Sequence, residues 1–77
     1  MMIINDHYYR TTTTVRMLSG TRAITLPVGT VLLALGPVGP TRFHAFRDCS
    51  TYEEGSLMVS CYAGFEHIGD QIDGRPA

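Results

Sequence analysis

Apolar and polar residues alternate along short stretches of this chain, and residues typical of turns separate the stretches. A period of two is typical of β-strands, and no long stretch has the period of a helix. The pattern predicts five strands, at residues 11–18, 22–26, 30–35, 42–47 and 57–62. Ser-Gly, Pro-Val-Gly and a loop with two Gly-Pro pairs separate the first four strands. The sequence therefore predicts an all-β fold.

The two ends of the chain are less regular. Met2 to Ile4 could begin a further strand, and Asn5-Asp6 is typical of a turn. Phe65 and Ile68 lie three residues apart, which predicts one short 3-10 turn near the C-terminus. Residues 70–77 are mostly polar and contain Gly and Pro, so we expect them to fray. The chain is predicted to be one domain, 1–77, with an ordered core at about 11–69.

The third predicted strand is apolar on both faces. Alternation places Val31, Leu33 and Leu35 towards the core, which leaves Leu32 and Ala34 on the face that should be polar. Something should therefore cover that face, either the N-terminal segment or another chain. We expect the contact surface for a protein partner to contain five residues: Leu32, Ala34, Tyr8, Tyr9 and Arg10.

Charge and size narrow the possible partners. The chain has 77 residues and a formal net charge of −1, and all six of its basic residues are Arg. Five Arg lie in residues 1–47 against one acid, and six acids lie in residues 48–77 against one Arg. The balanced total gives no overall field towards nucleic acid or an anionic membrane. A domain this small buries only about 60% of its unfolded surface, which favours association with a partner or with itself.

The sequence predicts a cytoplasmic protein. The chain does not begin with a basic stretch followed by an apolar run, as a secretory signal would. Its longest strongly apolar run, at 31–35, is far shorter than the roughly 20 residues of a membrane helix. Cys49 and Cys61 are therefore expected to be reduced thiols.

The chain contains residue types for three kinds of chemistry, but their spacing supports none of them. Four residues could ligate zinc but show no Cys-x-x-Cys pair: His44, Cys49, Cys61 and His67. Three have the types of a catalytic triad but lie in no nucleophile elbow: Ser60, His67 and Asp70. Gly36 and Gly39 are not followed by the Lys of a phosphate loop. We expect no metal, no cofactor and no catalytic residue.

Two segments resemble SH3-like small β-barrels. Residues 24–32, Ile-Thr-Leu-Pro-Val-Gly-Thr-Val-Leu, resemble a strand, a turn and a strand of such barrels, and residues 57–68 resemble their fourth strand, 3-10 turn and fifth strand. The resemblance covers residues 11–69 and implies a small five-stranded barrel with one short 3-10 turn. An OB-like barrel or another small meander stays open.

One enzyme family has a comparable segment. Val59-Ser60-Cys61-Tyr62 followed by Glu66-His67-Ile68 resembles the Val-Gln-Ile-Tyr and Glu-x-Ile of the plasmid-borne dihydrofolate reductases that confer trimethoprim resistance. That resemblance would imply a tetrameric enzyme with a central pore. The ligand-contacting Gln and Ile of the family are not matched, and the chain has no Lys to match its pore lysine. We interpret the likeness as shared barrel geometry.

The sequence favours a small non-enzymatic interaction module that binds another protein. A phage- or plasmid-encoded accessory or inhibitor protein is one form that such a module takes. The first alternative is a nucleic-acid-binding barrel, which would use an aromatic ring flanked by guanidinium groups: Arg42, Phe46 and Arg47. The second alternative is an oligomeric enzyme of the reductase kind.

Overall fold

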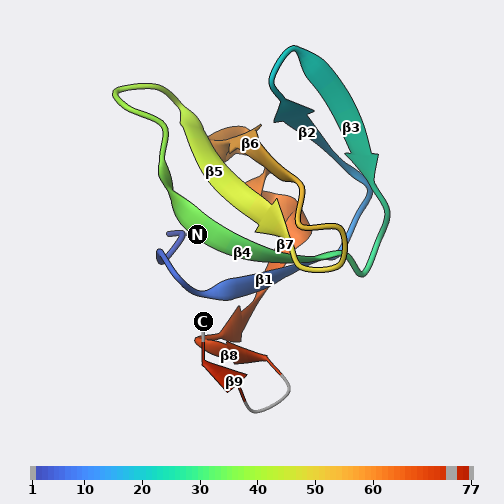
Figure 1. Cartoon of the computed structure of the whole chain (residues 1–77), viewed down its shortest axis with the longest axis vertical. Helices are drawn as coiled ribbons and strands as arrows, with labels where there is room; N and C mark the ends of the chain where they lie inside the picture. The colour runs from blue at the N-terminus through green and yellow to red at the C-terminus, as the bar shows by residue number, and fades with distance from the viewer. Residues whose placement is uncertain (1, 73–74, 77) are drawn as a thin grey trace.

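Antiparallel strands account for most of the chain. The computed structural model describes residues 2–72 and 75–76, and over these residues it contains nine strands and one short 3-10 helix (Figure 1). The strands are β1 Tyr8–Thr11, β2 Val15–Ser19, β3 Arg22–Leu26, β4 Val31–Pro37, β5 Phe43–Asp48, β6 Glu54–Met58, β7 Phe65–Gly69, β8 Gln71–Ile72 and β9 Arg75–Pro76. The 3-10 helix η1, Val59–Gly64, lies between β6 and β7. The prediction of an all-β fold with a small 3-10 piece is confirmed.

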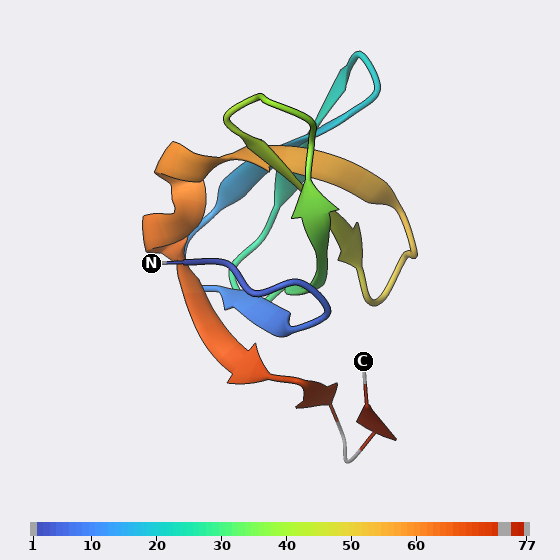
Figure 2. The same ribbon diagram turned by 90° about the vertical axis from the view of Figure 1, so that its left-hand side faces the viewer.

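Seven of these strands form one curved sheet. Its order is β3-β2-β6-β5-β4-β1-β7, and every pairing in it is antiparallel. The sheet curls around the core but does not close, because β3 and β7 stand at its two ends and do not pair with each other (Figure 2). The sheet thus has seven strands and two open edges where the sequence predicted a five-stranded barrel.

The first predicted strand is divided in two. Residues 22–26 and 42–47 form β3 and β5 almost as predicted, but residues 12–14 are not in a strand. β1 pairs with β4 and β7, whereas β2 pairs with β3 and β6. The chain has to leave one set of partners and reach the other within these three residues. The alternation of Thr and Val continues across the break and therefore conceals it.

The predicted positions of the last strand and of the 3-10 turn are wrong. The strand ends at Met58, and η1 follows over residues 59–64. Residues 65–68, predicted as the 3-10 turn, belong to β7, where Thr11 is opposite Phe65 and Arg10 is opposite Glu66. β6 and β1 are separated by two strands in the sheet, so the chain needs a connection to reach the edge of β1. η1 makes that connection.

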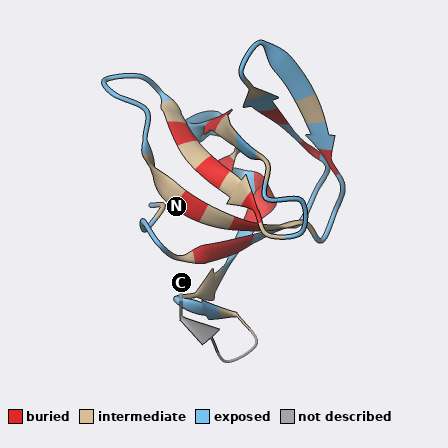
Figure 3. Ribbon diagram, viewed as in Figure 1, coloured by how far each residue is buried: buried red, intermediate tan, exposed pale blue. Residues whose placement is uncertain are grey.

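The core lies on the concave side of the sheet. The face of β4 that points towards this core is the one opposite to the predicted face. Leu32 and Ala34 are both 0% exposed, whereas Leu33 and Leu35 are half-buried on the outer face (Figure 3). Because β4 is apolar on both faces, its alternation does not determine which face is inward. Leu32 and Ala34 pack in a cluster with residues from β1, β2, β3, β5, β6, η1 and β7: Tyr9, Val15, Met17, Leu26, Phe46, Leu57, Tyr62 and Phe65.

The end of the chain forms a separate small ladder. β8 pairs with β9, with Gln71 opposite Pro76 and Ile72 opposite Arg75. The predicted frayed tail also includes residues 73, 74 and 77, which lie outside the described residues. Within the described part of the chain, no helix is long and apolar enough to cross a bilayer.

Candidate functional site

The five residues predicted to contact a partner do not form a surface. Leu32, Ala34 and Tyr9 are at most 1% exposed, and Tyr8 is 8% exposed. Arg10 is exposed, but its Nη1 lies 2.7 Å from Oε1 of Glu66 on β7. The prediction placed Leu32 and Ala34 on the wrong face of the strand, so the chain itself covers them.

The three residues of the nucleic-acid alternative are also separated. Phe46 is 0% exposed and packs edge-on against Tyr9, Tyr62 and Phe65, so its ring is not accessible to a base. Arg47 donates from Nη2 to Oε2 of Glu54 at 2.7 Å. Arg42 is exposed at the start of β5. This arrangement provides no stacking platform flanked by guanidinium groups.

The candidate metal ligands and triad residues do not come together in one site. No three of the His, Cys, Asp and Glu side chains in the described ranges come together as a metal site would require. His67 contacts His7, with Nε2 of His67 and Nδ1 of His7 2.7 Å apart. Ser60 is exposed on η1, and the stretch Val59–Tyr62 that resembles the reductase pore strand lies in this helix.

His44 is buried among aromatic rings. It is 8% exposed, and its ring centroid lies 5.2 Å from that of Phe46 and 6.3 Å from that of Tyr62. Its Nε2 and the Tyr62 hydroxyl have no hydrogen-bond partner among the described residues. Burial lowers the pKa of His44 and raises the pKa of Tyr62. Both side chains are therefore neutral at pH 7.

An open cleft of about 600 Å³ lies between β3 and the β5–β6 loop. β3 and the turn after it form one wall, which includes Thr25, Pro27 and Val28. The loop forms the other wall, which includes Asp48, Cys49, Ser50, Thr51 and Glu53. Both apolar and hydroxyl side chains line the cleft, so it offers both kinds of contact.

The β5–β6 loop is held in one conformation by Asp48. Oδ1 of this buried carboxylate accepts hydrogen bonds from the backbone N–H and the hydroxyl of Ser50, both at 2.8 Å, and from the N–H of Thr51 at 3.4 Å. The N–H of Tyr52 donates to the carbonyl of Asp48 at 2.8 Å, and the N–H of Asp48 donates to the carbonyl of Glu53 at 2.9 Å. These bonds fix the wall of the cleft before anything binds.

Tyr52 stands at the tip of this loop in a strained conformation. Its φ of +61° lies in the left-handed region, which non-glycine residues rarely adopt, and its side chain is 75% exposed. The Asp48 network holds the backbone there. A strained residue that presents an exposed aromatic ring is typical of functional sites.

β3 presents an unpaired edge to the cleft. Gly20, with φ +64°, occupies the first position of a two-residue turn, which makes Ser19 and Arg22 the closing hydrogen-bonded pair of the β2–β3 hairpin. Hydrogen-bonded and non-hydrogen-bonded pairs alternate along an antiparallel ladder, so the N–H and C=O groups of Ala23 and Thr25 point away from β2. No strand within the described residues pairs with this edge.

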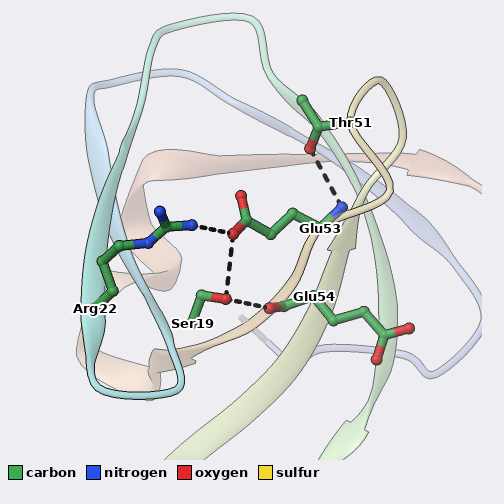
Figure 4. A network of polar contacts seen from close by, with 5 residues as sticks. All are labelled: Ser19, Arg22, Thr51, Glu53 and Glu54. Carbon is green, nitrogen blue, oxygen red and sulfur yellow. Dashed lines mark hydrogen bonds and ion pairs between the residues drawn. The ribbon is translucent and has the colours of Figure 1, made fainter.

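An ion pair joins the two walls at one end of the cleft. Arg22 Nη2 at the start of β3 lies 2.6 Å from Oε1 of Glu53, and Ser19 Oγ donates to the carbonyl of Glu54 at 3.0 Å (Figure 4). Glu53 therefore has a charged partner, whereas the donors to Asp48 are all neutral groups. Burial is the main cause that raises the pKa of Cys49 in the cleft wall, so this thiol is protonated and a poor nucleophile.

The chain has no match among protein-family models, curated proteins or solved structures. The site therefore rests on geometry alone. The residues of the β5–β6 loop that form one wall of the cleft were not among the predicted contact residues. The Asp-x-Ser pattern at Asp48 and Ser50, typical of a turn closed by a carboxylate, was the signal available.

Proposed function

We propose that this protein is an interaction module that binds an extended segment of another protein by adding it as a strand to β3. One observation carries the proposal: the unpaired edge of β3 borders an open cleft whose opposite wall is preformed. Strand addition takes its affinity from main-chain hydrogen bonds at an exposed edge and its specificity from pockets that accept alternate side chains. The edge and the cleft offer these two elements together.

The dimensions and the chemistry of the cleft support this proposal. Its volume of about 600 Å³ accommodates one or two side chains of a bound strand. Alternate residues of such a strand would point into the cleft towards Ile24, Leu26 and Val31, which are apolar and partly or fully buried. The cleft therefore favours apolar side chains at every second position of the ligand.

Exposed residues around the cleft support the same function. Val28, in the turn after β3, is 63% exposed, and Tyr52 is 75% exposed in the opposite loop. Tyrosine is enriched in the energetically important parts of protein interfaces, because it combines a large apolar ring with a hydroxyl group. Val28 lines one wall, and Tyr52 lies between the lining residues Thr51 and Glu53 in the loop that forms the other wall, which supports a contact with the partner on both sides of the bound strand.

A cytoplasmic module of this kind would act as an accessory or inhibitor protein, by covering a segment of a larger protein. Kinship with SH3-like barrels is part of the proposal. It is supported by the curled antiparallel sheet and by a 3-10 helix followed by a strand that pairs with β1.

The test uses peptides selected from a random library against the folded protein. Thr25→Pro removes an N–H that points away from β2, so the variant should keep the hairpin and lose strand addition. We expect the selected peptides to bind Thr25→Pro at least tenfold more weakly than the parent, measured by fluorescence anisotropy.

Thr25→Ala is the matched control, because it changes the same side chain and keeps the N–H. It should bind the peptides within about twofold of the parent. Thermal unfolding of both variants shows whether the fold is retained. Equal binding by Thr25→Pro and Thr25→Ala, with both proteins folded, would refute strand addition at β3.

A further inference from the structure

A second groove lies on the other side of the β2–β3 hairpin from the cleft. It has a volume of about 470 Å³ and lies between the start of β2 and η1. Thr13, Thr14, Val15 and Arg16 line one side, and Ser60, Cys61, Ala63 and Gly64 line the other. Three hydroxyl groups, one guanidinium group and a small apolar surface therefore face one space.

The two sides of the groove are fixed to each other by close contacts. The N–H of Thr12 donates to the carbonyl of Gly64 at 2.6 Å. A Cβ atom on Gly64 would lie 2.6 Å from Oγ1 of Thr13 and 3.5 Å from Cγ2 of Val15. Gly64 is buried, and only the absence of a side chain allows this approach. The groove is therefore preformed and does not need a ligand to assemble it.

Among the described residues that line this groove, Arg16 is the only charged one. Arg10, Arg22 and Arg47 each form an ion pair with a glutamate, whereas Arg16 and Arg42 form none with the part of the chain that the structure describes, and of these two only Arg16 lines the groove. Exposed apolar side chains follow on the neighbouring elements: Leu18 on β2, Met58 at the end of β6 and Val59 at the start of η1 are 41%, 43% and 46% exposed. An unpaired guanidinium group in an apolar setting calls for an anionic partner that also has apolar surface.

We propose that this groove binds the carboxylate of an Asp or Glu side chain carried in an apolar segment of a protein partner. The fork of Arg16 binds the two carboxylate oxygens, and the hydroxyl groups of Thr13, Thr14 and Ser60 provide further donors. Leu18, Met58 and Val59 contact the flanking apolar residues. Charge complementarity at Arg16 favours this ligand whether or not a strand adds to β3.

The test uses two blocked pentapeptides of sequence Ala-Leu-Glu-Leu-Ala and Ala-Leu-Gln-Leu-Ala. Titration of the isotope-labelled protein, followed by the backbone amide signals of residues 13–16 and 60–64, measures both affinity and position. We expect the Glu peptide to bind at least tenfold more tightly than the Gln peptide, with its largest shifts in these two segments. Arg16→Gln should remove that preference, whereas Arg16→Lys should keep part of it.

Arg10→Gln is the matched control, because Arg10 is an exposed guanidinium group with a partner of its own. It should leave the affinity for the Glu peptide unchanged. The proposal is overturned if Arg16→Gln binds the Glu peptide like the parent, or if the shifts lie outside the groove. It is also overturned if a single-stranded oligonucleotide displaces the Glu peptide at a lower concentration than free peptide does, which would assign the groove to phosphate.

Discussion

The central strands β4 and β5 and the β2–β3 hairpin are held in place by different means. Leu32, Ala34 and Phe46 in the centre are 0% exposed, and each central strand has a neighbour on both sides. β2 joins the rest of the sheet through a single ladder pair, Leu18 opposite Ser56, and β3 is exposed at three of its five residues. The hairpin stands away from the body of the molecule in Figure 1.

The comparison shows where the sheet has freedom to move. Three buried side chains, Val15, Met17 and Leu26, attach the hairpin to the core, and the polar contacts of Ser19 and Arg22 hold its tip. Regions with few buried apolar contacts open locally at lower cost than the core. We therefore expect the hairpin to open before the centre, which would widen the cleft beside β3.

The largest effect is expected in the centre. Phe46→Ala removes a fully buried ring that packs against Tyr9, Tyr62 and Phe65, and should lower the free energy of unfolding by about 3–5 kcal/mol. Denaturant titration followed by circular dichroism measures it. Leu18→Ala on the hairpin, where the side chain is 41% exposed, should cost less than about 1 kcal/mol. Similar losses in the two variants would contradict the comparison.

A change at the junction should separate the two regions. A Cβ on Gly55 would lie 2.6 Å from both the carbonyl oxygen of Leu18 and Cγ of Met17. Gly55→Ala should therefore push the hairpin away and destabilise the fold by about 1–3 kcal/mol. Hydrogen exchange should accelerate in β2 and β3 far more than in β4 and β5. Ser56→Ala is the neighbouring control and should leave exchange unchanged, so uniform acceleration in Gly55→Ala would mean that the hairpin and the centre open together.

Acid should weaken the centre through His44. Burial lowers the pKa of this side chain in the folded state, so the unfolded chain binds more protons as the pH falls below about 6.5. His44 therefore lowers the free energy of unfolding as the pH falls below that value, by at most about 1.4 kcal/mol for each pH unit, and has no such effect above it. His44→Phe should be less sensitive to pH than the parent between pH 7.5 and 5.5, as measured by denaturant titration. Parallel stability curves for the two proteins would show that His44 does not sense pH.

The smallest effect is expected from the ion pair at the hairpin tip. Arg22 is 71% exposed and Glu53 is 35% exposed, and exposed pairs contribute only about 0.2–1 kcal/mol. A double-mutant cycle with Arg22→Gln and Glu53→Gln measures the coupling. The coupling should shrink in high salt. A coupling that salt leaves unchanged would indicate that the hairpin is held more firmly than its exposure implies.

The sequence patterns predicted where the strands lie more accurately than which face of each strand points towards the core. Residues 22–26 and 42–47 became β3 and β5, because turn residues bound both and their alternation is clear. In β4 the alternation was present but carried no polar residue to mark the outer face, so Leu32 and Ala34 were assigned to the wrong side. Residues 59–62 also alternate, which predicted a strand, but they lie in η1.

The candidate site depends on contacts that no local pattern contains. The cleft brings residues 24–31 next to residues 48–53, and their proximity arises only when the sheet curls. Gly20 and the Asp-x-Ser pattern indicate the local turns at either wall, but not that the turns face each other. The unpaired edge of β3 follows from the order of the whole sheet.

The pairing of β1 constrains when the protein can complete its fold during synthesis. Residues 8–11 are made before the other strands of the sheet, yet one side of their ladder is filled by residues 65–69, which are made more than fifty residues later. Loop closure over that distance is slow compared with the formation of a hairpin such as β2–β3. Until β7 has emerged, Tyr9 lacks the aromatic contact of Phe65, and the edge of β1 stands open to other nascent chains. A chaperone that shields strand edges would therefore have most to protect in this interval.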